Sequence, residues 1–148
     1  MPLMTTTIDA RIATTARERE DAFAVRLAVF VGEQGIPRSE ELDDFDASAT
    51  HCVAYDFAGT PVGAGRLLLF DGYAKIGRMA VLASHRKANI GAAVLATLER
   101  EAASQGIPLI KLSAQLHARG FYERCGYTAH GDVYVDVGIP HVDMEKRL

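Results

Sequence analysis

An apolar strand and an amphipathic helix meet in the segment Val81–Ala92, and the turn between them reads Arg-x-x-Asn-x-Gly. Backbone N–H groups in the first turn of a helix have no intrahelical partners and lie at the positive end of the helix dipole. The fold must therefore bring a helix start to the end of a strand, an arrangement that predicts a binding site for phosphate.

The rest of the chain is a succession of strands and helices, with no linker, repeat or low-complexity tract. Hydrophobic periodicity, turn signals and capping residues, among them a capping box at Thr15-x-x-Glu18, predict seven strands and three helices. The strands are expected over residues 8–12, 51–57, 62–70, 73–81, 109–112, 127–136 and 141–146, and the helices over 16–31, 90–105 and 116–125. This order predicts an α/β (α+β) chain with one mixed sheet and helices on both faces.

Length and composition narrow the class of protein. The 148 residues are expected to form a single domain, 1–148. A net charge of −3 argues against nucleic acid or an anionic membrane surface as a partner. No apolar run has the length of a transmembrane helix and the start lacks a signal peptide, so a cytoplasmic protein is expected. Cys52 and Cys125 have no metal-ligand spacing and are expected to be reduced, mostly structural thiols.

The residue types of the turn help to distinguish three kinds of phosphate-binding site. A P-loop would need G-x-x-x-x-G-K-[ST], and no Lys-Ser or Lys-Thr pair follows Gly91. A dinucleotide fold would need G-x-G-x-x-G after the first strand of a parallel unit, whereas this turn follows three strands with an antiparallel pattern. The third alternative is the pyrophosphate of coenzyme A.

This third alternative is favoured by a resemblance. Residues 86–91 resemble motif A of the GNAT superfamily of N-acetyltransferases, R/Q-x-x-G-x-G/A, with Arg86 and Gly91 in place and Asn89 at the first glycine. Asparagine is the residue that, after glycine, best tolerates left-handed backbone. We therefore expect this turn, which we call the cradle, to bind pyrophosphate. Its affinity for acetyl-CoA is the property that the asparagine puts in question. Lys87 stands where relatives often carry glycine, and it either faces the phosphate or is solvated.

A second segment, residues 114–127, looks like motif B of the same superfamily, N-x-x-A-x-x-x-Y-x-x-x-G-F. Gln115 replaces Asn and Tyr127 replaces Phe, and the spacing is unchanged. Within the superfamily the chain is most similar to the ElaA and YjcF-like group, with which it shares Ala114-Gln115, Val29–Gln34 and Gly138–His141 followed by Met144. The resemblance covers the chain from about Val25 to Leu148.

The resemblance implies the GNAT fold, a mixed and mostly antiparallel sheet of six to seven strands with splayed central strands. It implies an acyltransferase that uses acetyl-CoA to acetylate an amine, with no metal. It also implies that acetyl-CoA is held by the end of the fourth strand, the cradle and motif B, which here are Met79, Ala80, Val81, Arg86, Lys87, Ala88, Asn89, Ile90, Gly91, Ala92 and Gln115.

Tyr122 is expected to be the general acid. It lies seven residues after Gln115 in motif B, at the position of the tyrosine that usually serves this role in the family. A phenol has a reference pKa of about 10, so it stays protonated at neutral pH and can donate to a departing thiolate. The alternative is a core tyrosine whose hydroxyl bonds the backbone.

The sequence does not single out one residue as the general base. A primary amine arrives mostly protonated and must lose a proton to a carboxylate, a histidine or a chain of waters. We take Glu33 and His117 as the catalytic candidates and Glu33, His51 and His141 as acceptor-binding residues, with each histidine also a candidate base. For any one of them the alternative is a structural histidine or a solvated carboxylate.

An acidic run occupies residues 33–46, where six carboxylates face only Arg38 and give a local charge of −5: Glu33, Glu40, Glu41, Asp43, Asp44 and Asp46. Such a rim would attract a cationic amine or polyamine. The alternative is a solvated surface loop without a ligand, which is the commoner meaning of a charge run.

Two functions are compatible with these features of the sequence. The first is an N-acetyltransferase that acts on a small-molecule amine or on a peptide amine. The second is a non-catalytic domain of the same fold that binds or senses an acyl-CoA. The family often pairs through its C-terminal strands, which makes a homodimer an expectation from the resemblance alone.

Overall fold

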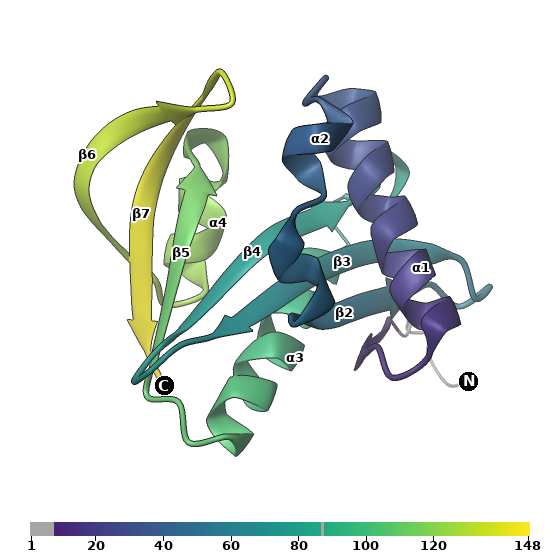
Figure 1. Ribbon diagram of the computed structural model, residues 1–148, viewed down its shortest axis with the longest axis horizontal. Helices are drawn as coiled ribbons and strands as arrows, with labels where there is room; N and C mark the ends of the chain where they lie inside the picture. The colour runs from purple at the N-terminus through teal and green to yellow at the C-terminus, as the bar shows by residue number, and fades with distance from the viewer. Residues whose placement is uncertain (1–7, 87) are drawn as a thin grey trace, which may run out of the picture.

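The computed structural model describes residues 8–86 and 88–148, which form a seven-stranded sheet flanked by helices (Figure 1). The strands lie in the order β1-β2-β3-β4-β5-β7-β6. Only β4 and β5 pair in parallel, so the expected mixed and mostly antiparallel sheet is confirmed. The strands are β1 (Asp9–Ile12), β2 (Thr50–Tyr55), β3 (Pro61–Leu69), β4 (Ala74–Val81), β5 (Leu109–Gln115), β6 (Thr128–Asp136) and β7 (Ile139–Arg147).

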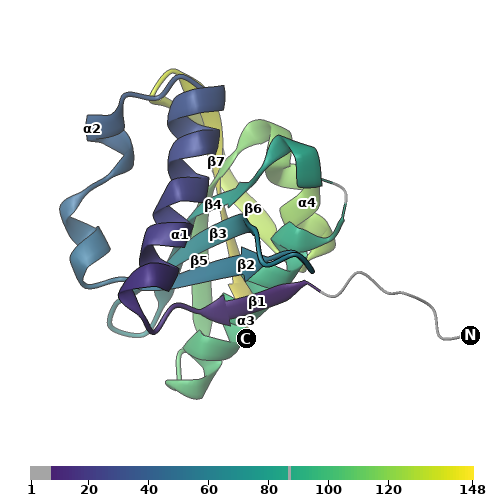
Figure 2. The ribbon, with the colours of Figure 1, turned by 90° about the vertical axis from the view of Figure 1, so that its right-hand side faces the viewer.

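Helices cover both faces of the sheet, as expected (Figure 2). They are α1 (Ala16–Arg26), η1 (Leu27–Glu33), α2 (Arg38–Glu41), η2 (Asp44–Ala47), η3 (Ala83–His85), α3 (Ile90–Ser104), η4 (Leu116–Ala118) and α4 (Arg119–Arg124). The apolar core is accordingly divided in two. Val25 and Val29 of the first helix pack with Val53 of β2 on one face, and Leu98 of α3 packs with Ala54 on the other.

Two glycines of β3 let α3 approach the sheet closely. A Cβ at Gly63 would lie 2.7 Å from Ile90 Cγ2, and one at Gly65 would lie 2.8 Å from Leu98 Cδ1 and from Val94 Cγ1. Carbon atoms do not approach to these distances, so any larger residue would push the helix away. These glycines therefore fix where the N-terminus of α3 lies relative to the strand ends.

The first helix begins at the predicted capping box, in which Thr15 accepts from the Glu18 N–H at 3.1 Å and Glu18 accepts from the Thr15 N–H at 3.1 Å. From Leu27 it continues as a π-helix to Glu33 and ends with an i to i+5 bond from the Gln34 N–H to the Val29 carbonyl. The wider π turn brings Val29, Phe30, Glu33 and Gln34 to one side, which faces β4 and β5.

The two central strands separate soon after they meet. β4 and β5 pair only at Ala74 with Ile110 and at Lys75 with Lys111. Farther along β4, Gly65 of β3 opposes two residues of β4, Arg78 and Met79, and Arg78 has a positive φ of 52°. Such a bulge bends and twists its strand, so β4 leaves β5 and the expected splay is present.

The acidic run is not a solvated loop. Most of it forms α2 and η2, and four of its six carboxylates pair with arginines: Glu33 with Arg86, and Glu41, Asp43 and Asp46 with arginines of three other elements. Arg26 of α1 is fully buried and donates to Glu41 at 2.7 Å and to Asp46 at 2.8 Å. Arg66 of β3 lies 2.7 Å from Asp43, and Arg78 of β4 lies 3.2 Å from Glu41. The run was wrongly expected to expose its charge, because these arginines are distant in sequence and could not be assigned to it. We call residues 27–47 the helical wall.

The β6–β7 hairpin, residues 128–147, forms the opposite wall and is called the hairpin wall. β7 pairs with β5 along its length, while β6 is the outer strand and is mostly exposed. Its turn consists of Val137 and Gly138, with φ of 47° and 77°. Positive φ at both central residues is the geometry of a type I′ turn, in which asparagine and glycine are preferred and a β-branched residue is strained.

Cys52 and Cys125 are both free thiols, as expected, with Cys52 buried and Cys125 partly buried. Burial raises the pKa of Cys52 to about 12, so its thiol stays protonated. None of the helices in the described ranges combines the length and the apolar character needed to cross a membrane.

Candidate active site

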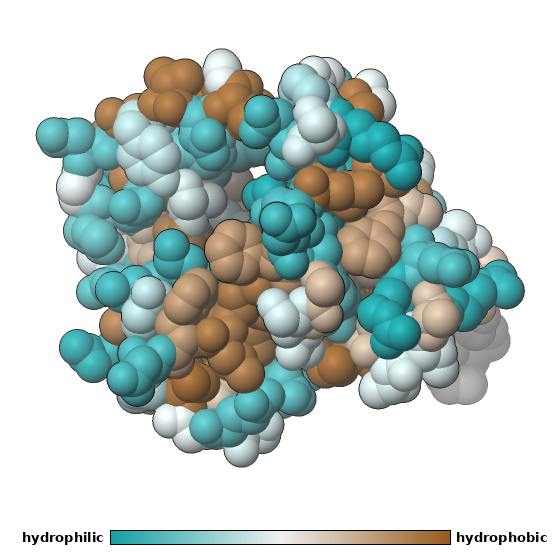
Figure 3. All heavy atoms as spheres, in the orientation of Figure 1, coloured by the Kyte–Doolittle hydropathy of each residue, from teal (hydrophilic) through white to brown (hydrophobic). Residues whose placement is uncertain are grey.

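A cavity of about 850 Å³ occupies the splay between β4 and β5. The helical wall bounds it on one side and the hairpin wall on the other, and its far end is the start of α3. Figure 3 shows the face with the opening, where apolar residues gather in the middle of the molecule between these two halves. The site therefore exists because the sheet opens at its centre.

The cradle has the backbone geometry that the sequence predicted. Asn89 is the N-cap residue of α3, with φ of 61° and ψ of 19°, which is the left-handed region that favours glycine. Its side chain makes no capping bond, and the carbonyl of Asn89 accepts from the Ala93 N–H. The N–H groups that open the helix therefore have no cap from Asn89, which is the arrangement an anion needs.

Most residues predicted to hold acetyl-CoA line this cavity, and they come from three separate segments. They are Met79, Ala80, Val81, Arg86, Asn89, Ile90, Gly91, Ala92 and Gln115. Ala88 is exposed and is not among the lining residues, whereas Lys87 lies outside the described residues. Gly91 allows α3 to pack against Phe121, because a Cβ there would lie 3.3 Å from the Phe121 ring.

Arg86 and Glu33 form a bidentate ion pair from the cradle to the helical wall. The Arg86 Nη1 and Nη2 atoms donate to the Glu33 carboxylate at 2.6 and 2.7 Å, and Nε donates to the Val81 carbonyl at 3.2 Å. The hydrogen bond from Arg86 lowers the pKa of Glu33. A carboxylate with a lowered pKa binds protons more weakly, so this pairing disfavours Glu33 as a base.

Tyr122 of α4 lines the cavity although only 7% of it is exposed. Its ring lies edge-on to Phe121 and Tyr127, with centroids 5.0 and 5.8 Å away. Burial raises the pKa of Tyr122 well above its usual value. The hydroxyl therefore keeps its proton throughout the neutral range.

Gln115, at the end of β5, is paired with Gln34 of the helical wall. Each amide nitrogen donates to the other amide oxygen, at 2.9 and 3.0 Å. The pair joins residues 81 positions apart at the point where the central strands have separated. It therefore fixes the width of the cavity at this point.

The histidines named from the sequence divide into two groups. His117 of η4 and His141 of β7 both line the cavity. His51 does not: it is 2% exposed, its Nε2 lies 2.9 Å from the Asp46 carbonyl, and its ring packs edge-on to Phe23. Burial lowers the pKa of His51. The expectation that His51 binds the acceptor is corrected, because it belongs to the buried charge network behind the helical wall.

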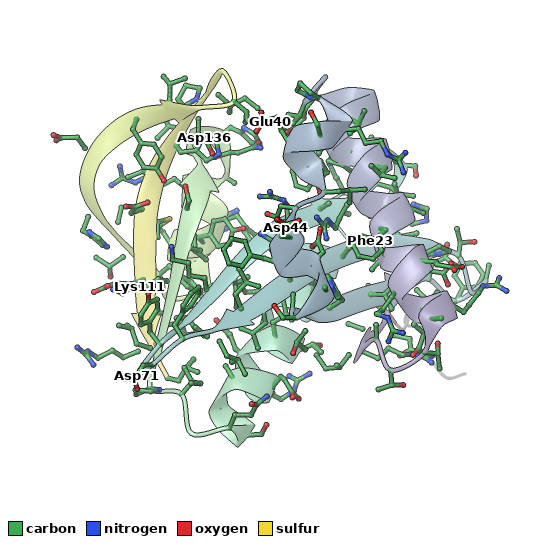
Figure 4. The ribbon with its side chains drawn as sticks, in the orientation of Figure 1. Phe23, Glu40, Asp44, Asp71, Lys111 and Asp136 are labelled. Atoms are coloured by element: carbon green, nitrogen blue, oxygen red, sulfur yellow. The ribbon has the colours of Figure 1, made fainter. Side chains whose placement is uncertain are left out.

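Sequence reasoning did not assign several residues of the cavity to the site, among them Arg78, Phe121 and Asp136. Asp136 of the hairpin wall and Glu40 of α2 lie on opposite sides of its opening (Figure 4). The hydrophobic pattern predicted strands and helices for these segments but contained no signal for how the two walls face each other. Of the two walls, only the helical wall had a signal in the sequence, which was the acidic character of residues 33–46.

A cavity at the splay of two parallel strands, with a helix N-terminus and an arginine at one end and a buried tyrosine beside it, defines a site suited to a phosphate-bearing acyl donor. Residues 17–148 match the family described as an acetyltransferase (GNAT) domain. The chain therefore belongs to the GNAT family of acetyltransferases, a family of acyltransferases.

Individual relatives agree with this assignment. The chain is 43% identical over 138 residues to the N-acetyltransferase YjcF of Bacillus subtilis, described as uncharacterized, covering 93% of this chain and 98% of that protein. A crystal structure of a Lactobacillus plantarum protein superposes with a TM-score of 0.88 at 30% identity, over 96% of this chain and 99% of that one. Escherichia coli ElaA has the same fold, with a TM-score of 0.79 at 24% identity, over 95% and 99%. The expected likeness to the ElaA and YjcF-like group is confirmed.

Proposed function

We propose that this protein transfers the acetyl group of acetyl-CoA directly to an amine within a ternary complex, with Tyr122 as the general acid. The observation that carries the proposal is that a buried tyrosine and the start of α3, which the Asn89 side chain does not cap, line one cavity. The two ends of an acyl-CoA, its pyrophosphate and its thioester, would need these two groups. The residues present therefore fit this cosubstrate.

Each part of the reaction has a group that can serve it. The N–H groups at the start of α3 and the Arg86 guanidinium would hold the pyrophosphate, and Arg86 would then exchange Glu33 for phosphate. The backbone of Met79, Ala80 and Val81 would hold the pantetheine arm and the thioester. The amine nitrogen attacks the thioester carbonyl carbon, the carbon–sulfur bond breaks, and the leaving sulfur takes the proton of Tyr122.

The acceptor in this proposal is an amine, either a small molecule or a peptide amine. Glu40 and Asp136 at the opening carry negative charge on both walls. Much of the remaining charge of the acidic run is neutralised by Arg26, Arg66 and Arg78, so it adds less attraction than the sequence suggested. A homodimer through the C-terminal strands stays a prediction, as do a single domain over 1–148 and a cytoplasmic location.

The test is thiol release from acetyl-CoA, followed with a thiol reagent in the presence and absence of a panel of amines. Tyr122→Phe should lower kcat by roughly 10²-fold, the scale of a general-acid contribution. Binding of acetyl-CoA, measured by calorimetry, should be nearly unchanged because the ring stays in place. Tyr73→Phe is the matched control, because Tyr73 stacks on Phe70 and is not among the cavity residues.

Two outcomes would contradict the proposal. An unchanged kcat for Tyr122→Phe would show that Tyr122 is not the general acid, whereas the proposed acetyltransferase activity would still stand. Acetyl-CoA that stabilises the protein but releases no thiol with any amine would instead favour the non-catalytic acyl-CoA-binding alternative.

A further inference from the structure

We propose that His141 is the general base of this site and removes the proton of the acceptor amine through its Nε2 atom. This inference rests on the proposed function, because it needs an amine to be the acceptor. It chooses one residue among the four that the sequence left open.

The hydrogen bonding of His141 fixes which ring nitrogen can accept a proton. Its Nδ1 lies 2.7 Å from the carbonyl oxygen of Ile139. A carbonyl oxygen can only accept, so Nδ1 carries the hydrogen and Nε2 of the neutral ring keeps a free lone pair. The residue is only 7% exposed yet lines the cavity, and no described residue forms a hydrogen bond with Nε2.

The ring is also fixed in orientation. His141 lies opposite Gln115 on β5 and opposite Tyr134 on β6. The Tyr134 ring stacks on the imidazole at 6.0 Å with an interplanar angle of 20°. Tyr134 is itself anchored, because its hydroxyl donates to Asp143 at 2.7 Å and is bonded to Ser113 Oγ. A buried imidazole held by a carbonyl and a stacked ring is preorganised to take up a proton.

Titratable and charged groups face His141 from several elements. The nearest along the strand pairing and on η4 are Tyr134 and Asp136 on β6, Asp143 on β7 itself and His117, while β5 presents the neutral Ser113 and Gln115. The other charged residues of the cavity lining are Glu40, Glu41, Arg78 and Arg124, together with Glu33, which is paired with Arg86. Asp143 is bonded to the Tyr134 hydroxyl, and Asp136 is a carboxylate of the hairpin wall that lines the cavity.

The other candidates are less suited to the role. Glu33 has a lowered pKa because of Arg86. His51 is buried outside the cavity. His117 is exposed on a single turn of 3₁₀ helix, and no hydrogen bond to it from the described part of the chain fixes its tautomer. Only His141 combines a fixed tautomer with a free nitrogen in the cavity.

An alkylammonium acceptor gives one proton to His141 Nε2, and the freed lone pair of the amine attacks the thioester carbon. As the carbon–sulfur bond breaks, the sulfur takes the Tyr122 proton, and the second proton lost by the nitrogen restores Tyr122. His141 releases its proton to solvent. The products are the acetylated amine, the free thiol of coenzyme A and one proton.

The test uses His141→Asn, because the asparagine amide can still donate to the Ile139 carbonyl but cannot take up a proton. The measurement is kcat/KM for thiol release from acetyl-CoA across pH 5 to 10, with ethylamine, spermidine and a lysine-containing peptide as acceptors. We expect a loss of roughly 10²-fold at neutral pH, and the limb that rises with pH should move toward the pKa of the amine itself. His130→Asn is the matched control, because His130 lies on β6 outside the cavity.

Two further readouts separate a base from a structural residue. Added imidazole should restore part of the activity of His141→Ala. Hydroxylamine, which is largely unprotonated at neutral pH, should lose much less rate than ethylamine in His141→Asn. Both comparisons are made within one variant, so they hold even if the variant is less stable than the wild type.

The inference is overturned if the wild type releases thiol and His141→Asn keeps its kcat/KM and pH profile. It is equally overturned if His117→Asn, and not His141→Asn, moves the profile. A wild-type protein that releases no thiol with any amine overturns the proposed function, and the base assignment with it.

Discussion

The two walls of the cavity are held in place by different forces. The helical wall depends on charges inside the protein, because Arg26, Arg66 and Arg78 join it to α1, β3 and β4. The hairpin wall depends on backbone pairing, with seven residue pairs between β5 and β7 and an outer strand that is mostly exposed. A wall held by buried ion pairs should respond to pH and to loss of one charge, whereas a wall held by strand pairing should tolerate changes of side chain.

The largest effect should follow from removing the central cation of the helical wall. Arg26→Ala takes from Glu41 and Asp46 the one partner that is fully buried and leaves them only Arg78 and Arg66, which should lower the free energy of unfolding by about 3–5 kcal/mol. Urea unfolding measures this loss. Arg11→Ala, which removes an exposed ion pair with Asp9 and Glu18, should leave the value nearly unchanged. Similar losses in both variants would contradict the difference between buried and exposed pairs.

A smaller effect is expected from pH. Burial alone would raise the pKa of Asp46, but the hydrogen bonds from Arg26, the Asp43 N–H and Arg66, together with the charge of Arg26, outweigh burial and lower the pKa to about 2. A lowered pKa in the folded state gives stability that is complete above the unfolded value of about 3.8 and is lost as pH falls toward 2, in total roughly 2 kcal/mol.

Urea unfolding between pH 5 and 2 measures this dependence. Asp46→Asn should flatten it, and the exposed Asp132→Asn on the hairpin wall should not. If the free energy of unfolding of Asp46→Asn falls with pH as steeply as that of the wild type, a group other than Asp46 causes the dependence.

The smallest effect tests the hairpin wall. Val137 adopts a left-handed conformation that suits asparagine, so Val137→Asn should raise the free energy of unfolding by about 1 kcal/mol. Chemical denaturation compares this variant with Val135→Asn, which changes an exposed valine of extended backbone two residues earlier. A loss of stability in Val137→Asn would show that contacts of the valine side chain in the cavity outweigh its backbone strain.

The features predicted well from the sequence are those encoded by neighbouring residues. The capping box at Thr15, the helix that starts at the cradle and the left-handed backbone of Asn89 all depend on a few consecutive positions. Tyr122 was expected in the site because of its position in motif B of the resemblance, and it lines the cavity. Its role as general acid stays a prediction.

The features missed depend on partners far along the chain. The acidic run was expected to be solvated because Arg26, Arg66 and Arg78 belong to elements that are adjacent only after folding. His51 was placed at the acceptor for the same reason. The tautomer of His141 depends on the Ile139 carbonyl, and hydrophobic periodicity carries no information about the geometry of that turn.

The π turn at the end of the first helix makes the length of that segment matter more than its composition. An α-helix advances by about 100° per residue, so loss of one residue between Leu27 and Glu33 would rotate everything beyond it by that angle. Glu33 would leave Arg86 and Gln34 would leave Gln115, with no amino acid type altered at either position. A single-codon deletion there would be more damaging than most substitutions, and related sequences can be compared by the spacing from Thr15 to Gln34 as well as by their residues.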